Sequence, residues 1–107
     1  MKYENKFEFI NDYMYLIIIK NNKEIKTLLD RKLYNKIKKT NWWINKAGYI
    51  ETTPKFNKNY LLHRFITNCP KDKIVHHINQ NKLDNRISNL KVMDALEHNL
   101  LHNPPKD

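Results

Sequence analysis

The first third of the chain shows the alternation of apolar and polar positions that is typical of β-strands. Residues 13–20 are mostly apolar, and in residues 23–29 every second side chain falls on one face. That face comprises Ile25, Thr27 and Leu29. Asn21 and Asn22 separate the two segments, and asparagine tolerates the positive φ of a tight turn. The pattern therefore predicts a β-hairpin over 13–29.

The middle of the chain predicts a short helix followed by more strands. The helix is expected over 30–39, with Asp30 as its N-cap and three apolar side chains facing inward. Those side chains are Leu33, Tyr34 and Ile37. Residues 42–45 and 49–53 predict two strands joined through the only glycine of the chain, and a further strand is expected over 59–62.

Two adjacent tryptophans, Trp42 and Trp43, lie in the first of these later strands. Neighbouring side chains of a strand point to opposite faces, so we expect one indole ring in the core and the other over a lysine stem. Stacking of one ring on an exposed base is the alternative.

Four of the five histidines lie in the last third of the chain. His76 and His77 are adjacent in the apolar run 74–78, so in a strand they would point to opposite faces. Residues 93–103 predict a helix with Asp94 as its N-cap and Glu97 as the capping-box partner; the two prolines that follow would end it.

This helix would place His98 and His102, four residues apart, on one face, where both imidazoles can bind one metal ion. One of the two strand histidines could be a third ligand. Three protein ligands leave an open position, which is the arrangement of catalytic metal sites. The other strand histidine would then be free to act as a general base.

The composition predicts a small protein outside the membrane. The chain has 107 residues, of which 40% are hydrophobic, so we expect one domain with a modest core. No apolar run is long enough to span a bilayer, and the N-terminus lacks the apolar region of a signal peptide. A soluble, cytoplasmic protein is expected, in a bacterial or phage-infected cell. The single cysteine, Cys69, excludes an internal disulfide and predicts a buried thiol.

The net charge of +9 suits a polyanionic partner, because each neutralised phosphate releases counterions. Between residues 30 and 46 there are six basic side chains and one acidic one, and these six are the candidate contacts with the DNA backbone. They are Arg31, Lys32, Lys36, Lys38, Lys39 and Lys46. The alternative is a lysine-rich surface that contacts only solvent.

Three stretches together resemble the HNH endonucleases, particularly the phage and intron-associated branch. They are LLHRFI at 61–66, VHHINQNKLDNRISNLKVM at 75–93, and His98. The branch carries L-H-R, then D/H-H-I-N-G-N-K-x-D-N-R-x-x-N-L, then a terminal His or Asn. The similarity covers residues 60–103, and several residue types at fixed spacings make it far more specific than a single H-x-x-x-H.

The resemblance implies a ββα-metal finger and a role for each matching residue. His76 corresponds to the first metal ligand and His77 to the general base that activates water. Asn89 corresponds to the asparagine that orients this base, and His98 to the second metal ligand. His102 matches a further histidine of the colicin-type members, in which three histidines hold the ion.

The sequence departs from the family pattern at two positions. Gln80 replaces the glycine of the I-N-G-N turn, so we expect Asn79 or Asn81 to adopt the positive φ instead. His76 replaces the usual aspartate. Three imidazoles should hold Zn²⁺ or Ni²⁺ more tightly than Mg²⁺. One divalent ion per site is expected, with Zn, Mg, Mn and Ni as candidates.

Five polar residues near the motif have other expected roles. Arg64 and Arg86 are candidates to bind the scissile phosphate, because a fixed guanidinium matches phosphate geometry. His63 is expected to be a hydrogen-bonded core histidine. Asp84 and Asn85 are expected to close the loop between the two finger strands.

The predicted fold is α+β in a single domain, 1–107. A small antiparallel β platform with a short helix, residues 1–59, would contact DNA, and residues 60–103 would form the ββα-metal (His-Me finger) motif. The expected activity is metal-dependent hydrolysis of double-stranded DNA to 5′-phosphate and 3′-hydroxyl ends. A monomer should nick, whereas a homodimer could cut both strands. Phage, homing and restriction roles all fit.

Two other functions fit the same residues. In one, His76, His98, His102 and a fourth ligand close a structural zinc site in a DNA-binding module without catalysis. The absence of cysteine ligands and the unused His77 argue against it. In the other, the chain is a regulatory protein derived from a nuclease. The intact set of His76, His77, Asn89 and His98 argues against that function.

Overall fold

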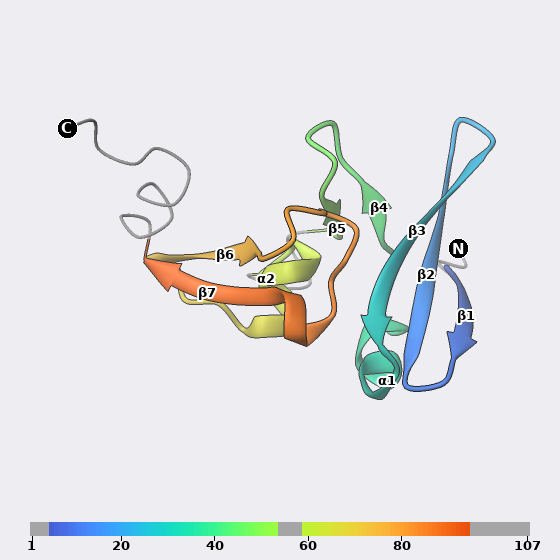
Figure 1. Cartoon of the computed structure of the whole chain (residues 1–107). Coiled ribbons are helices and arrows are strands. Elements are labelled where there is room, and N and C mark those ends of the chain that lie inside the picture. The colour runs from blue at the N-terminus through green and yellow to red at the C-terminus, as the bar shows by residue number, and fades with distance from the viewer. Residues whose placement is uncertain (1–4, 54–58, 95–107) are drawn as a thin grey trace.

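The computed structural model describes residues 5–53 and 59–94. Its largest sheet is antiparallel, with strand order β1-β2-β3 (Figure 1). The strands are β1 (Lys6–Ile10), β2 (Tyr13–Lys20) and β3 (Lys23–Asp30). The predicted hairpin is confirmed, and both residues of its turn have positive φ, 54° at Asn21 and 63° at Asn22. Strand β1 was not predicted from the sequence.

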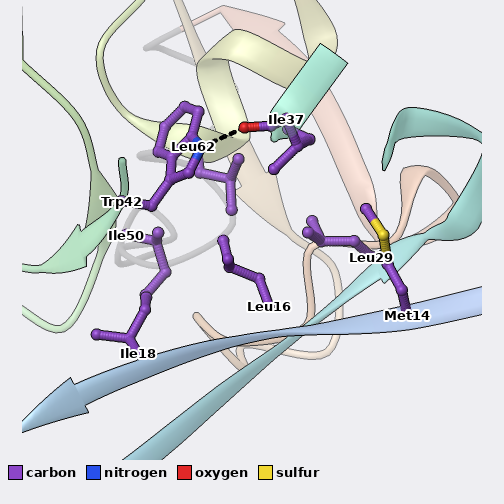
Figure 2. Close-up of a cluster of buried hydrophobic side chains, with 8 residues drawn as sticks. All are labelled: Met14, Leu16, Ile18, Leu29, Ile37, Trp42, Ile50 and Leu62. Atoms are coloured by element: carbon purple, nitrogen blue, oxygen red, sulfur yellow. Dashed lines mark hydrogen bonds between the residues drawn. The ribbon is translucent and has the colours of Figure 1, made fainter. Parts of the chain in front are cut away.

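One face of this sheet forms the hydrophobic core. Met14, Leu16 and Ile18 alternate along β2 and are all buried, and Leu29 joins them from β3. Figure 2 shows these side chains converging with Ile37, Trp42, Ile50 and Leu62, which come from the segments that cover the sheet. The indole Nε1 of Trp42 donates a hydrogen bond to the carbonyl of Ile37, 2.9 Å away. The polar atom of the largest core side chain is thereby satisfied.

The predicted helix after β3 is shorter than expected. It consists of a 3-10 turn (Arg31–Leu33) and one α-helical turn, α1 (Tyr34–Ile37). Asp30 occupies the N-cap position as expected, but its side chain makes no cap hydrogen bond. Its Oδ1 accepts instead from the backbone N–H of Ile87 at 2.7 Å, so this carboxylate ties the sheet to a loop 57 residues later.

The two short strands after α1 are confirmed. They are β4 (Trp43–Ile44) and β5 (Ile50–Glu51), which pair antiparallel. One ring of the tryptophan pair was expected in the core, and Trp42 is buried there. The other was expected over a lysine stem, but the indole of Trp43 instead donates a hydrogen bond to the Glu51 carboxylate at 3.1 Å.

The prediction of a strand over 59–62 is wrong. Leu61 makes one isolated bridge to Glu51, and helix α2 (Leu62–Thr67) begins at the next residue. The helix ends at Asn68, whose φ of 51° is the left-handed conformation typical of a helix end. Cys69 is buried as expected.

The C-terminal hairpin consists of β6 (Lys73–His77) and β7 (Leu90–Asp94), with His77 opposite Leu90. Its two strands match the strands of the predicted finger. Met93, which was assigned to the helix predicted over 93–103, lies in β7, and Asp94, its predicted N-cap, is the last residue of that strand. The rest of that segment, with Glu97, His98 and His102, lies outside the described residues. Over the described residues the structure is therefore small and mixed, mostly strands with few helices.

A loop between β6 and β7 joins the hairpin to the N-terminal sheet. Leu28 of β3 donates its N–H to the carbonyl of Leu83 and accepts from the N–H of Asn85, each at 2.8 Å. Asp84 thereby makes a parallel bridge with Leu28 along β3 (Figure 1). Among the described residues, no helix is both long and apolar enough to cross a membrane.

The core packing predicts that Leu16→Ala destabilises the fold by about 2–5 kcal/mol, because it leaves a cavity under a fully buried side chain. Ile19→Ala on the same strand is the matched control. Its side chain is 60% exposed, so the cost should stay below about 1 kcal/mol. Urea denaturation measures both free energies of unfolding. Equal losses in the two variants would contradict this assignment of the core.

Candidate functional site

The site is built around His77, the last residue of β6. Its side chain is buried, and its ring centroid lies 5.1 Å from that of His63 on α2 and 6.2 Å from that of Tyr49, just before β5. Tyr49 and His63 are themselves in ring contact at 5.1 Å. Three segments of the chain thus meet at one imidazole.

A chain of hydrogen bonds fixes the ring of His77. Its Nε2 lies 2.8 Å from Oδ1 of Asn85. Asn85 is fully buried, and its Nδ2 donates to Thr27 Oγ1 at 2.7 Å and to the carbonyl of Lys82 at 3.3 Å. The hydroxyl of Thr27 in turn donates to the carbonyl of Leu83 at 2.9 Å. The histidine side chain is therefore held by the N-terminal sheet as well as by its own hairpin.

Burial sets the protonation of both histidines. It lowers the pKa of His77 below its ordinary value, although the hydrogen bond with Asn85 and the charge of Asp84 act in the opposite direction. Burial lowers the pKa of His63 to about 4, helped by the charge that His77 carries when protonated and by the charge of Arg64. His63 is thus buried in the core as expected, and it is neutral at pH 7.

His76 has surroundings different from those of its neighbour. It is half-buried, pairs with Lys91 across the hairpin, and belongs to the motif as the expected first metal ligand. Within residues 5–53 and 59–94, no group of three His, Cys, Asp or Glu side chains could hold a metal ion. The other two expected ligands, His98 and His102, lie outside this part of the chain. Three imidazoles are a donor set that suits a divalent transition ion, and His76 is the described member of it.

Asn89 holds the loop that follows His77. Its Nδ2 donates to Asn79 Oδ1 at 2.9 Å and to the carbonyl of Asp84 at 2.8 Å, and its Oδ1 accepts from the N–H of Asn79 at 3.0 Å. The hydrogen bond with the ring of His77 belongs to Asn85 instead. That Asn89 orients the base stays a prediction, and these contacts allow it to act through the loop.

The tight turn at the start of this loop differs from expectation. Gln80 itself has a positive φ of 64°, whereas either Asn79 or Asn81 was expected to adopt it. The reason lies in their side chains: Asn79 Oδ1 accepts from the N–H of Asn81, and Asn81 Oδ1 accepts from the N–H of Leu83. Both asparagines stabilise the turn by side-chain hydrogen bonds, and the residue between them, Gln80, adopts the positive φ.

Asp84 and Arg86 form a bidentate ion pair, with Arg86 Nε and Nη2 at 2.8 and 2.7 Å from the two carboxylate oxygens. The hydrogen bonds from Arg86 hold the pKa of the buried Asp84 carboxyl below its usual range. As expected, Asp84 and Asn85 close the loop. The guanidinium of Arg86 also lies over the ring of Tyr13, 5.8 Å from its centroid.

The guanidinium of Arg64 joins α2 to the hairpin. Its Nη1 donates to the carbonyl of Lys73 and its Nη2 to that of Pro70, each at 2.8 Å. These bonds occupy two of the five N–H donors of each guanidinium and hold both side chains in place.

The six basic candidates are only partly brought together. Five lie on or beside α1, where three of their charged groups cover aromatic rings: Arg31 over Phe9 at 4.6 Å, Lys38 over Tyr34 at 5.0 Å and Lys36 over Phe65 at 4.8 Å. The other two are the exposed Lys32 and Lys39. Lys46 follows β4, whose hairpin extends away from α1 in Figure 1, so Lys46 does not belong to the same patch.

Sequence reasoning gave Asn85 only a structural role and gave Thr27 none at the site. For Thr27 a signal existed, because a hydroxyl between Ile25 and Leu29 on a buried face must find a hydrogen-bond partner. For Asn85 no comparable signal exists, since a polar loop residue gives no indication of which side chain it will contact. Tyr49 was missed for the same reason.

Comparisons with known proteins bear on this site. Residues 60–100 match the family model described as HNH endonuclease. The chain is also 32% identical over an alignment of 87 residues to "SPbeta prophage-derived putative HNH homing endonuclease YosQ" of Bacillus subtilis (strain 168), covering 55% of this chain. It spans about half of that relative, 50% of its length. No solved structure gives a significant match.

The lowered pKa of His63 predicts a pH-dependent stability. Above about pH 6.5 the histidine is neutral in both states; as the pH falls to about 4, only the unfolded chain binds the proton. The free energy of unfolding should therefore fall over this window by roughly 3 kcal/mol through this group. His63→Gln removes this titrating group, while His77 remains in both proteins. Denaturation at several pH values from 7 to 4 measures the free energy of unfolding of wild type and variant. If the two proteins lose stability equally as the pH falls, His63 is not the group responsible.

Proposed function

Because residues 60–100 match the HNH endonuclease family model, we propose that this chain is a metal-dependent endonuclease that hydrolyses phosphodiester bonds of double-stranded DNA. The observation that carries the proposal is the state of His77. Its ring is buried, burial lowers its pKa and thereby favours the neutral imidazole, and its Nε2 is engaged by Asn85. A neutral imidazole with one nitrogen anchored has the other available to accept a proton.

In the proposed reaction, Nδ1 of His77 takes a proton from a water molecule as the water oxygen attacks phosphorus. The bond between phosphorus and the 3′ oxygen breaks, which leaves a 5′-phosphate and, after protonation from solvent, a 3′-hydroxyl. A divalent ion held by His76, His98 and His102 would supply positive charge to stabilise the charge that develops on the leaving oxygen. Asn89 would keep His77 in place through the loop that it braces.

Three biological roles suit this chain: a phage enzyme, a homing endonuclease and a restriction enzyme. The Bacillus subtilis relative is named as a "putative HNH homing endonuclease", which supports the second. One catalytic histidine serves one strand at a time, so the monomer would nick DNA. A homodimer would be needed for concerted cleavage of both strands.

The basic patch at α1 is the proposed contact with the DNA backbone. Lys32 and Lys39 are exposed there, whereas the charged groups of Arg31, Lys36 and Lys38 are already placed over aromatic rings. A charge held over a ring costs less conformational entropy to present to a phosphate than one on a freely rotating stem. Exposed and ring-held charges together would bind sequence-independently.

His77→Ala should lower DNA cleavage by at least about a hundredfold, because it removes the base while leaving the expected metal ligands in place. Supercoiled plasmid is incubated with wild type and variant, each stripped of metal and resupplied with Mg²⁺, Mn²⁺, Ni²⁺ or Zn²⁺. Only the wild type should form open-circle or linear DNA. Calorimetry of metal binding and a DNA-binding assay should show both proteins unchanged.

Cleavage by His77→Ala at the wild-type rate would refute the role of His77 as base. If neither protein cuts the plasmid with any metal, a library of random targets distinguishes a sequence-specific enzyme, which cuts some members, from a zinc-containing binding module, which cuts none.

The double variant Lys32→Ala/Lys39→Ala should weaken DNA binding and reduce the slope of log affinity against log salt by about 2, since each phosphate contact contributes about 0.9. The matched control is Lys20→Ala/Lys23→Ala, two exposed lysines that flank the β2–β3 turn. Fluorescence anisotropy across a salt series measures both slopes. Equal reductions in the two variants would contradict a contact localised at α1.

A further inference from the structure

Thr27 lies in the N-terminal sheet, fifty residues before His77, and is fully buried on the inward face of β3. A threonine hydroxyl has one proton to donate. At Thr27 this proton goes to the carbonyl of Leu83, so the oxygen can only accept from its other neighbour, Asn85 Nδ2. The carbonyl of Lys82 likewise can only accept from that same nitrogen. Two acceptors therefore select the amide end of Asn85.

This selection determines which atom of Asn85 faces the histidine. With Nδ2 directed to Thr27 and Lys82, the oxygen Oδ1 is the atom 2.8 Å from His77 Nε2. A carbonyl oxygen only accepts hydrogen bonds, so Nε2 must carry the proton, and in the neutral ring Nδ1 must then be bare. Flipping the amide would place Oδ1 against two acceptor oxygens, which opposes the reversed arrangement.

We propose that Thr27 is a positioning residue for the proposed nuclease reaction: through Asn85 it fixes His77 in the tautomer whose Nδ1 accepts the proton of water. The kinetic part of this proposal depends on the proposed function, whereas the tautomer itself does not. Because Leu28 is paired with Leu83 and Asn85 along β3, the backbone holds Thr27 and Asn85 at a fixed spacing. The sheet thereby acts on the protonation geometry of a residue in another part of the fold.

The wild-type protein gives the first test. Nitrogen-15 NMR of the full chain labelled at histidine, at alkaline pH where the ring is neutral, distinguishes the protonated nitrogen from the bare one by chemical shift. The signals are assigned to His77 by their loss in His77→Ala. The expected result is a proton on Nε2. A proton on Nδ1 would overturn the proposal whatever the variants do.

Thr27→Val and Thr27→Ser give the second test. Valine keeps the shape of threonine but removes the hydroxyl, so the amide of Asn85 loses one of its two acceptors and can flip. We expect Thr27→Val to populate the Nδ1-protonated tautomer of His77 and to lower kcat by about tenfold to a hundredfold with KM little changed. Thr27→Ser retains the hydroxyl and should restore both the tautomer and the rate. A folded Thr27→Val with the wild-type tautomer would refute the proposal.

Asn85→Asp tests whether Thr27 acts through Asn85. A carboxylate accepts from Nε2 in either orientation, so the Nε2 proton should persist, and adding Thr27→Val to this background should leave the tautomer unchanged. A shift of the tautomer in the double variant would overturn the route through Asn85. If no form of the chain cleaves DNA while the NMR results are as expected, the proposed function fails and the tautomer assignment stands.

Discussion

The pairing of the 83–85 loop with the edge of β3 is the constraint on which the site depends. A two-stranded hairpin such as β6–β7 has little stability alone, because it buries too few side chains to offset the entropy of ordering it. Here Leu28 makes two backbone hydrogen bonds to the loop, and Asp30 adds a third contact through the N–H of Ile87. The sheet edge, which would otherwise expose unpaired backbone groups, is covered by the loop that carries the site.

This attachment also accounts for the environment of His77. The ring is enclosed because α2, the segment before β5 and the loop all reach it, and burial in turn lowers the pKa of both His77 and His63. Two neighbouring histidines in a chain of net charge +9 would repel each other if both were protonated. Neutral rings therefore let the protein pack imidazoles against each other near a positively charged surface without that cost.

Local patterns predicted the β2–β3 hairpin and the short strands β4, β5 and β6, but they missed β1, placed a strand over 59–62 and predicted the polar contacts poorly. The β2–β3 hairpin followed from alternation and from two asparagines that tolerate positive φ, and β6 followed from an apolar run. The role of Asp30 was missed because a cap is a local signal, whereas its real partner, Ile87, lies 57 residues away. Contacts between distant residues leave no periodic trace in the sequence. The conformation of Gln80 was missed for a local reason instead, since the asparagines on either side of it use their side chains to hold the loop.

The residues that surround His77 extend beyond the segment that carries the family motif. The segment that matches the HNH endonucleases begins at residue 60, yet Thr27, Leu28 and Tyr49, which hold or enclose His77 and its loop, precede it. The motif contains His77 and its loop, but one of the two hydrogen-bond acceptors of the Asn85 amide, Thr27 Oγ1, comes from the sheet with which the loop is paired. The N-terminal sheet therefore has a role beyond the DNA contact proposed for it. It supplies fixed groups that hold the loop and Asn85, so substitutions on its buried face can alter the surroundings of His77 without touching the motif.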